Sequence, residues 1–306
     1  MTEARITFGI IGCGLIGASW AALAASAGYP VHAWDPEETA RKNFLARVAA
    51  AQVQLSALGM TGKADVILAD TLQDVARDCR WIQENAPERL ELKAALLAEV
   101  EFASSPETII ASSTSSLLWS ELARNLRRPS HFLLAHPFNP PHLMPLVEIY
   151  ASEASIRDRA VDFYTRLGRV PVCLKREAQG HIANRLASAL WREAVNIVAE
   201  GIADVADVDR ALVNGPGLRW SVIGAHMAYH LGGGPGGIAH YLQHLGPSQE
   251  RRWADLGAPK LTPEVCKLLT DGIAAEAAGR SIAELEQDRD AALIASLQLR
   301  NRMPAS

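Results

Sequence analysis

Residues 6–17 read ITFGIIGCGLIG, and this stretch decides the fold. Residues 6–12 form an apolar run with the length of a buried strand, and the small residues 15–27 that follow have helical character up to Gly28. Gly12, Gly14 and Gly17 match the pattern GxGxxG, whose glycines permit a tight turn, the close approach of a pyrophosphate and close helix packing. The order of strand, glycine turn and helix therefore predicts a dinucleotide-binding unit.

Two further features refine the expected cofactor site. Leu15 and Ile16 open the helix, whose N-terminal N–H groups would face a bound pyrophosphate. Asp35 ends a second predicted strand, residues 31–35, where its carboxylate can accept hydrogen bonds from an adenosine ribose and repel a 2′-phosphate. The pattern favours NAD over NADP. Two alternatives stay open: a glycine turn in an unrelated α/β protein, and Asp35 as a simple helix N-cap.

Strand-sized segments continue along the first half of the chain and alternate with helical patterns. The predicted strands are residues 66–68, 81–83, 108–111, 132–134, 146–150 and 170–175. The helical patterns cover residues 72–76, 88–100 and 156–167. Alternation of this kind predicts an α/β fold of Rossmann type, with a mainly parallel sheet covered on both faces. Beyond Gly180 only helical spacing remains, so we expect an NAD-binding domain over residues 1–177 and an all-helical domain over residues 178–306, with a loop at 231–237.

Composition excludes several classes of protein. The 306 residues are 49% hydrophobic and carry 34 acidic against 30 basic side chains, which is typical of a globular chain and not of a general nucleic-acid binder or a disordered one. Four well-separated cysteines without a CxxC pair predict neither a disulfide framework nor a cysteine zinc site. Residues 1–5 lead directly into the first strand, and no apolar run is long enough for a bilayer. We expect a cytoplasmic protein without a membrane partner.

Polar groups capable of acid–base chemistry follow three predicted strands. They are the serines and threonine of residues 112–116, His136 within HPFNPP, and Glu148 within PLVEI. Oxidation of an alcohol needs a base for the hydroxyl proton, and His136 is the candidate. Glu148 can fix the imidazole tautomer, and Ser115 can donate to the substrate oxygen. The alternatives are a helix cap and a proline-stiffened turn, and spacing alone does not link the three features.

Taken together, these residues resemble the 3-hydroxyacyl-CoA dehydrogenase family. The matching segments, in order, are GIIGCGLIGASWA, WDP, ENAPERLELK, IIASSTSSL, HPFNPPHLMPLVEI and GHIANRL. The resemblance implies an NAD-dependent enzyme with a helical dimerising domain, and therefore a homodimer. By motif position it implies a catalytic set of His136, Glu148, Ser115 and Asn184, and cofactor contacts from Glu88, Lys93 and Asn139. An exposed helix pair is the alternative for Glu88 and Lys93.

Two residues depart from the family pattern, which commonly has Asn at the position of Ser113 and Phe at that of His181. Both departures bear on the shape of the substrate site. All four catalytic residue types are retained, which favours an enzyme over the non-enzyme alternative, an NAD-binding structural protein like the lens crystallin of the same superfamily.

The second domain bears on the substrate. Residues 215–221, GPGLRWS, and the run WREA at 191–194 resemble the L-carnitine dehydrogenase branch and, less closely, the lambda-crystallin or L-gulonate 3-dehydrogenase branch. This implies oxidation of the 3-hydroxyl of a small 3-hydroxy acid, with L-carnitine as the best candidate. L-gulonate and 3-hydroxybutyryl-CoA are the alternatives.

A zwitterion such as carnitine needs a guanidinium at its carboxylate and aromatic faces at its quaternary ammonium. Ser188 and Trp191 share a helical face with Asn184, and Arg219 and Trp220 follow in the second domain. These four are the predicted substrate-binding residues, and Tyr229 and Tyr241 are weaker candidates. The alternative roles are dimer-core aromatics and a surface ion pair.

Two HxxxH pairs, His226 with His230 and His240 with His244, have the spacing of helical zinc ligands. Met227 stands where a metalloprotease has its glutamate, and hydride transfer needs no metal. We therefore expect no metal site. The two alternatives for these histidines are packing and a place in the substrate pocket.

Overall fold

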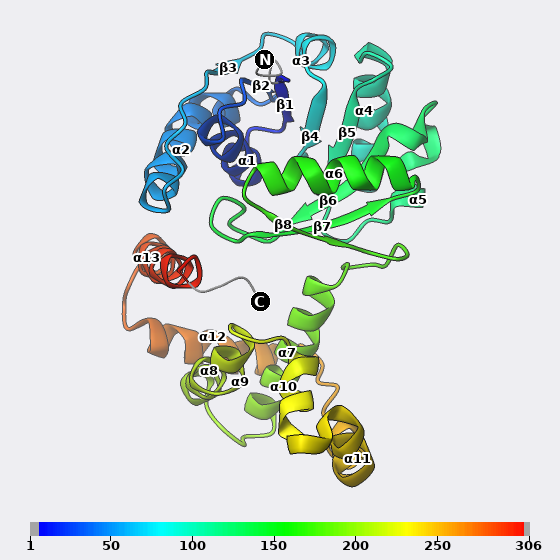
Figure 1. Cartoon of the computed structure of the whole chain (residues 1–306). Coiled ribbons are helices and arrows are strands. Elements are labelled where there is room, and N and C mark those ends of the chain that lie inside the picture. Colours follow the sequence, from blue (N-terminus) through cyan, green and yellow to red (C-terminus); the bar gives the residue numbers. More distant parts are fainter. Residues whose placement is uncertain (1–5, 303–306) are drawn as a thin grey trace. The chain divides into compact units, whose positions relative to one another are not determined.

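The computed structural model describes residues 6–302 and divides the chain into two compact units (Figure 1). The α/β unit contains the residues up to Arg185 together with those from Asp288 onward, and the helical unit contains Leu186–Gln287. The last part of the chain thus groups with the first unit, whereas the sequence placed all of residues 178–306 in the helical domain. Residues 1–5, for which the sequence predicts no targeting segment, lie outside the described residues. Within residues 6–302, no helix has the length and apolar character to cross a bilayer.

A single sheet of eight strands forms the α/β unit, in the order β3-β2-β1-β4-β5-β6-β7-β8. The strands are β1 (Phe8–Ile11), β2 (Val31–Trp34), β3 (Val66–Leu68), β4 (Trp81–Glu84), β5 (Ile109–Ser112), β6 (Phe132–Pro137), β7 (Leu146–Ala151) and β8 (Val170–Cys173). All neighbours are parallel except β6 and β7, which are antiparallel. The predicted α/β fold with a mainly parallel sheet is confirmed, and the first six strands have the Rossmann order.

Helices connect the strands of the α/β unit and make up the helical unit. The first group is α1 (Leu15–Ser26), α2 (Glu38–Ala57), α3 (Leu72–Asp78), α4 (Leu90–Ala103), α5 (Trp119–Leu122) and α6 (Ala154–Arg166), with short 3-10 turns η1 (Ala123–Asn125) and η2 (Pro129–His131). The later group is α7 (Ala183–Ala199), α8 (Val205–Asn214), α9 (Pro216–Trp220), α10 (Ala225–Gly232), η3 (Gly234–Gly236), α11 (Gly237–Asp255), α12 (Pro263–Ala277) and α13 (Ile282–Arg300). The predicted loop at 231–237 covers the last two residues of α10, Gly233, the 3-10 turn η3 and the first residue of α11.

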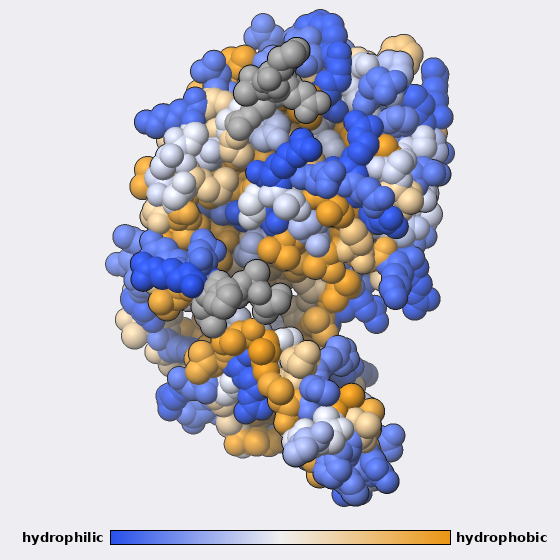
Figure 2. Space-filling model, viewed as in Figure 1, coloured by the Kyte–Doolittle hydropathy of each residue, from blue (hydrophilic) through white to orange (hydrophobic). Residues whose placement is uncertain are grey.

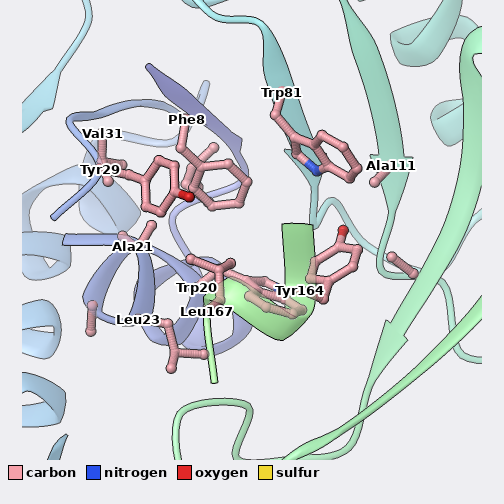
Figure 3. Close-up of a cluster of buried hydrophobic side chains, with 14 of the residues drawn as sticks. Phe8, Trp20, Ala21, Leu23, Tyr29, Val31, Trp81, Ala111, Tyr164 and Leu167 are labelled. Atoms are coloured by element: carbon pink, nitrogen blue, oxygen red, sulfur yellow. The ribbon is translucent and has the colours of Figure 1, made fainter. Parts of the chain in front are cut away.

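Each face of the sheet has its own hydrophobic core, because successive strand side chains point to opposite faces. On β5, Ile109 packs into the core under α1, α2 and α6, whereas Ile110 packs into the core under α3 and α4. Figure 3 shows the first core, where Trp20 of α1 and Tyr164 of α6 meet with ring centroids 5.4 Å apart. Full burial of each large side chain contributes about 2–3 kcal/mol. The two cores fix the strand ends, and with them the groups that follow each strand.

Strand order and register place two features of the site. The chain reverses direction across the sheet between β1 and β4, and ligands of open α/β sheets bind at the carboxyl ends of the strands beside such a switch. In the antiparallel pair of β6 and β7, His136 lies directly opposite Glu148. Because paired residues of an antiparallel ladder point to the same face, this register brings the imidazole and the carboxylate together.

The helical unit is packed differently. Among its residues, the buried apolar side chains are Val195, Val205 and Tyr241. Many other large apolar side chains are exposed, and Figure 2 shows orange residues gathered over this unit in the lower part of the view. Exposed apolar faces of this extent are typical of surfaces that take part in protein–protein contacts.

Candidate active site

The glycine turn at the end of β1 has the geometry that a pyrophosphate site requires. Gly12 has φ +99°, and a Cβ on Gly17 would lie 1.9 Å from the Gly12 carbonyl oxygen. A Cβ built on Gly14 meets no atom within 4 Å, so the space above this residue is open. Gly14 is also the N-cap of α1 and provides no side-chain cap, which leaves the first N–H groups of the helix available to an anion.

Asp35 follows β2 and has a fixed carboxylate. One oxygen accepts a hydrogen bond from the Cys13 backbone N–H at 2.7 Å, and the other accepts from the Glu37 N–H at 2.8 Å. Arg41 donates to the backbone carbonyls of Asp35 and Pro36. The carboxylate therefore lies beside the glycine turn, as the Rossmann pattern predicts for a ribose contact.

A cavity of about 420 Å³ opens beyond the carboxyl ends of β4, β5 and β6. Its lining residues are Ile16, Asn85, Ala86, Glu88, Lys93, Ser113, Ser115, His136, Pro137, Phe138, Asn139 and Asn184. The cavity thus brings together the predicted base, the predicted hydroxyl donor, Asn184 and three of the predicted cofactor contacts, Glu88, Lys93 and Asn139.

His136 and Glu148 form a buried pair at this cavity. The imidazole Nδ1 lies 2.9 Å from Glu148 Oε2, and Glu148 Oε1 accepts hydrogen bonds from the backbone N–H groups of Ile182 and Ala183 at 2.7 and 2.9 Å. Burial alone would raise the pKa of this carboxyl, but the hydrogen bonds from His136 and the two N–H groups outweigh it, so the pKa lies below its ordinary value. An ionised carboxylate only accepts, so Nδ1 of the imidazole carries the proton and Nε2 has the free lone pair.

The serine segment after β5 wraps around Glu88. Oxygen Oε1 of Glu88 accepts hydrogen bonds from the Thr114 hydroxyl at 2.7 Å and from the Ser115 and Ser116 N–H groups at 2.8 and 2.9 Å. Burial acts to raise the pKa of Glu88, but these bonds and the Lys93 charge hold it below its ordinary value. Asn184 donates to the Ser115 carbonyl at 3.3 Å. Ser115 and Asn184 are thereby fixed beside each other at the cavity wall.

Lys93 is held by a residue that the sequence reasoning missed. Its ammonium lies 2.7 Å from Glu84 Oε1 and 3.7 Å from Glu88 Oε2, and the Lys93 and Glu84 side chains are fully buried. Glu84 also accepts hydrogen bonds from the Ser112 hydroxyl at 2.5 Å and the Ala86 N–H at 2.6 Å. A lone carboxylate at the end of an apolar strand is the signal that could have identified it, because a buried charge needs a partner.

Ser113, the first departure from the family pattern, belongs to a network of hydrogen bonds at the ends of β4 and β5. Its hydroxyl accepts hydrogen bonds from Gln83 at 2.8 Å and from the Trp20 indole at 3.2 Å, and donates to Asn85 Oδ1 at 2.7 Å. Gln83 in turn accepts from the Tyr164 hydroxyl at 2.5 Å. Gln83 and Asn85 were not predicted, although two polar residues in an otherwise apolar strand end are a signal for such a network.

The second departure, His181, lies against the base. Its ring centroid is 5.0 Å from that of His136, and its Nε2–H donates to the Thr114 carbonyl at 3.0 Å. Burial lowers the pKa of His181, with the nearby His136 acting in the same direction, so the neutral form is favoured. His181 therefore packs against the ring of His136, and its hydrogen bond to Thr114 holds it there.

The predicted substrate residues of the second domain lie at exposed positions of the helical unit. Ser188 and Trp191 are on α7, and Arg219 and Trp220 are on α9. The Tyr229 and Tyr241 rings pack together with centroids 5.1 Å apart. Their predicted contacts with substrate stay predictions.

The histidine pairs lie in the same unit. His230 Nδ1 accepts a hydrogen bond from the Ile238 N–H at 3.1 Å, and the rings of His240 and His244 have centroids 4.2 Å apart. Across the part of the chain that the structure describes, no three histidine, cysteine or acidic side chains come together as a metal site would require. His230 acts as a local cap, and His240 and His244 pack against each other.

Two family models match the chain in succession. The NAD binding domain of 3-hydroxyacyl-CoA dehydrogenase matches residues 7–178, and the C-terminal domain of the same enzyme matches residues 180–268. The L-carnitine dehydrogenase of Nocardiopsis dassonvillei is 43% identical over 299 residues, covering 96% of this chain and 91% of the relative. The L-carnitine dehydrogenase of Streptomyces coelicolor is 40% identical over 299 residues, covering 96% and 94%.

Two solved structures of dehydrogenases are similar to this chain in fold and sequence. The crystal structure of 5-formyl-3-hydroxy-2-methylpyridine 4-carboxylic acid 5-dehydrogenase, described as an NAD⁺-dependent dismutase, has a TM-score of 0.80 at 25% identity and covers 98% of this chain and 100% of that one. The (S)-3-hydroxybutyryl-CoA dehydrogenase of Ralstonia eutropha has a TM-score of 0.61 at 26% identity, covering 70% of this chain and 79% of that one.

Proposed function

Because the chain belongs to the 3-hydroxyacyl-CoA dehydrogenase family of NAD-dependent oxidoreductases, we propose that it oxidises the 3-hydroxyl of L-carnitine to 3-dehydrocarnitine. The observation that carries the chemistry is the buried pair of His136 and Glu148 at a cavity beside the glycine turn. The substrate rests on L-carnitine dehydrogenases about 40% identical over nearly the whole chain. A small-molecule substrate suits a cavity of this size.

The residues at the glycine turn fit a dinucleotide. The open space above Gly14 and the uncapped start of α1 would hold the pyrophosphate, with Leu15 and Ile16 beside it. The Asp35 carboxylate would accept hydrogen bonds from the adenosine ribose and repel a 2′-phosphate, which favours NAD over NADP. Glu88, Lys93 and Asn139 line the cavity at the nicotinamide side. When bound there, NAD supplies the hydride acceptor.

The chain's own groups handle the proton. Glu148 keeps the proton of the imidazole on Nδ1, so the Nε2 lone pair of His136 accepts the proton of the substrate hydroxyl. The imidazolium that forms is then stabilised by the carboxylate 2.9 Å away. The Ser115 hydroxyl, which donates to Glu88 Oε1 at 3.1 Å in this structure, would turn to donate a hydrogen bond to the substrate oxygen, and Asn184 would make the second polar contact at the same wall. Together they orient the alcohol for reaction.

The two ends of carnitine call for different partners. Arg219 would bind the carboxylate, because a guanidinium offers two parallel donors to it. Trp191 and Trp220 would face the quaternary ammonium, which aromatic rings attract without a hydrogen bond. Ser188 lies about one turn before Trp191 on α7 and would contact the same end of the substrate.

A homodimer formed through the helical unit completes the proposal. The exposed apolar side chains of that unit, such as Leu231 and Leu242, would be covered by the same surface of a second copy. Cysteines without a partner, two buried and two exposed, suit a reducing, cytoplasmic location.

The deciding experiment is NADH formation by the purified protein with four alcohols: L-carnitine, L-gulonate, 3-hydroxybutyrate and (S)-3-hydroxybutyryl-CoA. We expect kcat/KM for L-carnitine to exceed the others by at least about tenfold, since removing a charged partner costs about 1.5 kcal/mol or more. The same assay with NADP in place of NAD tests the role of Asp35. A preference for the thioester or for gulonate would overturn the substrate, and a preference for NADP would overturn the cofactor.

A further inference from the structure

The segment between β6 and β7, residues 138–145, contributes to the wall of the cavity and contains Asn139, the residue proposed to contact the nicotinamide end of the cofactor. Phe138 and Asn139 line the cavity, and the rest of the segment turns back through hydrogen bonds from the Leu143 and Met144 N–H groups to the Pro140 carbonyl. We call this segment the cofactor loop. Its position decides where the Asn139 amide lies, and His142 is its buried anchor, with 7% of the residue exposed.

His142 is bound on both sides by other elements. The Ser19 hydroxyl of α1 lies 3.0 Å from Nδ1, and Gln54 Oε1 of α2 lies 2.5 Å from Nε2. Burial lowers the pKa of His142 to about 4, so the neutral ring is favoured near neutral pH. A neutral imidazole donates from one nitrogen and accepts at the other. One of the two neighbours, Ser19 or Gln54, must therefore donate to the ring and the other must accept from it.

Asp290 of α13 sets that direction. The Gln54 amide Nε2 donates to Asp290 Oδ2 at 3.0 Å, and a carboxylate can only accept. Gln54 therefore turns Oε1 toward His142, the Nε2–H of His142 donates to it, and Nδ1 accepts from the Ser19 hydroxyl. Arg289 holds the other Asp290 oxygen at 2.8 Å, and the Asp290 side chain is only 15% exposed.

Asp290, the last member of this hydrogen-bonded relay, lies outside the segments that the two family models match, whereas Ser19, Gln54 and His142 lie within the NAD binding domain match. The C-terminal domain model ends at residue 268, whereas Asp290 lies in the segment from Asp288 onward that groups with the α/β unit. A second contact joins the two elements, since Gln298 donates to the Ala57 carbonyl at 2.8 Å, but it touches neither Gln54 nor His142. Loss of the Gln298 bond would therefore affect only the packing of α13 against α2. Loss of the Asp290 bond would also affect Gln54 and His142.

We propose that Asp290 is a positioning residue for the cofactor loop: acting through Gln54 and His142, it holds the loop in the position that presents Asn139 to the nicotinamide half of the cofactor. Asp290 does not touch the cavity itself. The proposal rests on the proposed use of a nicotinamide cofactor, but not on the identity of the alcohol.

The test is NADH titration, followed by steady-state kinetics, of Asp290→Ala and Gln298→Ala in the full chain. Loss of one charged hydrogen bond in the relay should weaken NADH binding about fivefold in Asp290→Ala. KM for NAD should rise by the same factor, with kcat and the KM of the alcohol within about twofold of the parent. Gln298→Ala, which removes only the docking bond, should bind NADH as the parent does.

A swap of donor and acceptor tests the direction of the relay. Gln54→Glu places two carboxylates against each other and should weaken NADH binding at least as much as Asp290→Ala. The double variant Gln54→Glu with Asp290→Asn restores a donor facing an acceptor, and should recover the parent affinity to within about twofold. This rescue also answers whether a single variant lost affinity through poor folding.

Equal NADH affinity of Asp290→Ala and the parent would overturn the proposal, as would equal losses in Asp290→Ala and Gln298→Ala or the absence of rescue in the double variant. A wrong assignment of the substrate would give a result that differs from these three. If the parent binds NADH but oxidises none of the four alcohols, the substrate is wrong and the titrations still decide the role of Asp290.

Discussion

The two units of this chain solve the problem of burying apolar side chains in opposite ways. The α/β unit closes two cores on either side of its sheet, and residues such as Phe8, Trp20 and Phe132 are fully buried there. In the helical unit, Leu231 and Leu242 are about 60% exposed, as are many of their neighbours. One unit buries its large apolar side chains within a single chain, and the other leaves many of them exposed, which is the surface that the proposed dimer would cover.

The proposed proton transfer and the proposed dimer contact therefore depend on different units. All the residues that line the candidate active-site cavity belong to the α/β unit, including Asn184, which precedes the boundary at Arg185. Proton transfer and cofactor binding should therefore respond to changes in the α/β unit. Oligomeric state should respond to changes in the helical unit.

The largest effect is expected from His136→Ala in the α/β unit. Removal of the general base should lower kcat by about 10²–10⁴-fold, because Nε2 is the group proposed to accept the hydroxyl proton. NADH affinity should stay within about twofold of the parent, since the ring is held by Glu148 and not by the glycine turn. Steady-state NADH formation and NADH titration measure the two quantities.

His131→Ala is the matched control, because His131 precedes the same strand and is absent from the cavity lining. It should leave kcat within about twofold. Turnover by His136→Ala near the parent rate would exclude the imidazole as the base and break the link between the α/β unit and the chemistry.

A second prediction compares one type of substitution in both units. Leu231→Glu with Leu242→Glu places charges on α10 and α11 of the helical unit and should weaken the dimer more than about tenfold, because unpaired charges are costly in a covered interface. Val53→Glu on α2, where the parent side chain is 73% exposed, should change nothing. Light scattering after size-exclusion chromatography gives the mass of each variant.

The contrast fails if the parent is a monomer at micromolar concentration, or if the Leu231 and Leu242 double variant keeps the dimeric mass. In the first case the exposed apolar side chains of the helical unit need another occupant. In the second case the interface lies on another face of the molecule.

Sequence alone predicted the parts of this chain that depend on local patterns. The glycine turn, the apolar strands and the helices between them follow from residues that lie next to each other in the chain, and the sheet confirms the α/β fold. The placement of His136 opposite Glu148 depends on an antiparallel register that the spacing of twelve residues does not by itself reveal. The family resemblance supplied that pairing before the register was known.

Contacts between distant segments were beyond the sequence. Gln83 and Ser113 are separated by 30 positions, and Gln54 and Asp290 by 236. Each of these polar side chains is unremarkable in its own segment, because only the fold shows that its partner is near. The same holds for the grouping of the last part of α13 with the α/β unit.

The last prediction concerns acid stability, and it too distinguishes the units. In the folded α/β unit the pKa of His142 is lowered to about 4 by burial, whereas an unfolded chain protonates this ring near its ordinary value of 6.5. Between these values the unfolded state binds more protons, so the free energy of unfolding falls as the pH is lowered from about 6.5 to 4. The shift corresponds to a loss of up to about 3 kcal/mol.

The measurement is urea unfolding at several pH values for His142→Gln and for His244→Gln, an exposed histidine of the helical unit. His142→Gln keeps a donor and an acceptor in place but cannot titrate, so its unfolding free energy should depend less steeply on pH below 6.5. His244→Gln makes the same substitution at an exposed position and is the control for the change of residue itself. His181, whose pKa is also lowered by burial, stays in both variants and contributes the same slope. Parallel curves for His142→Gln and the parent would mean that the ring is protonated or solvated in the folded protein, and that the α/β unit is less tightly closed around it than its contacts with Ser19 and Gln54 require.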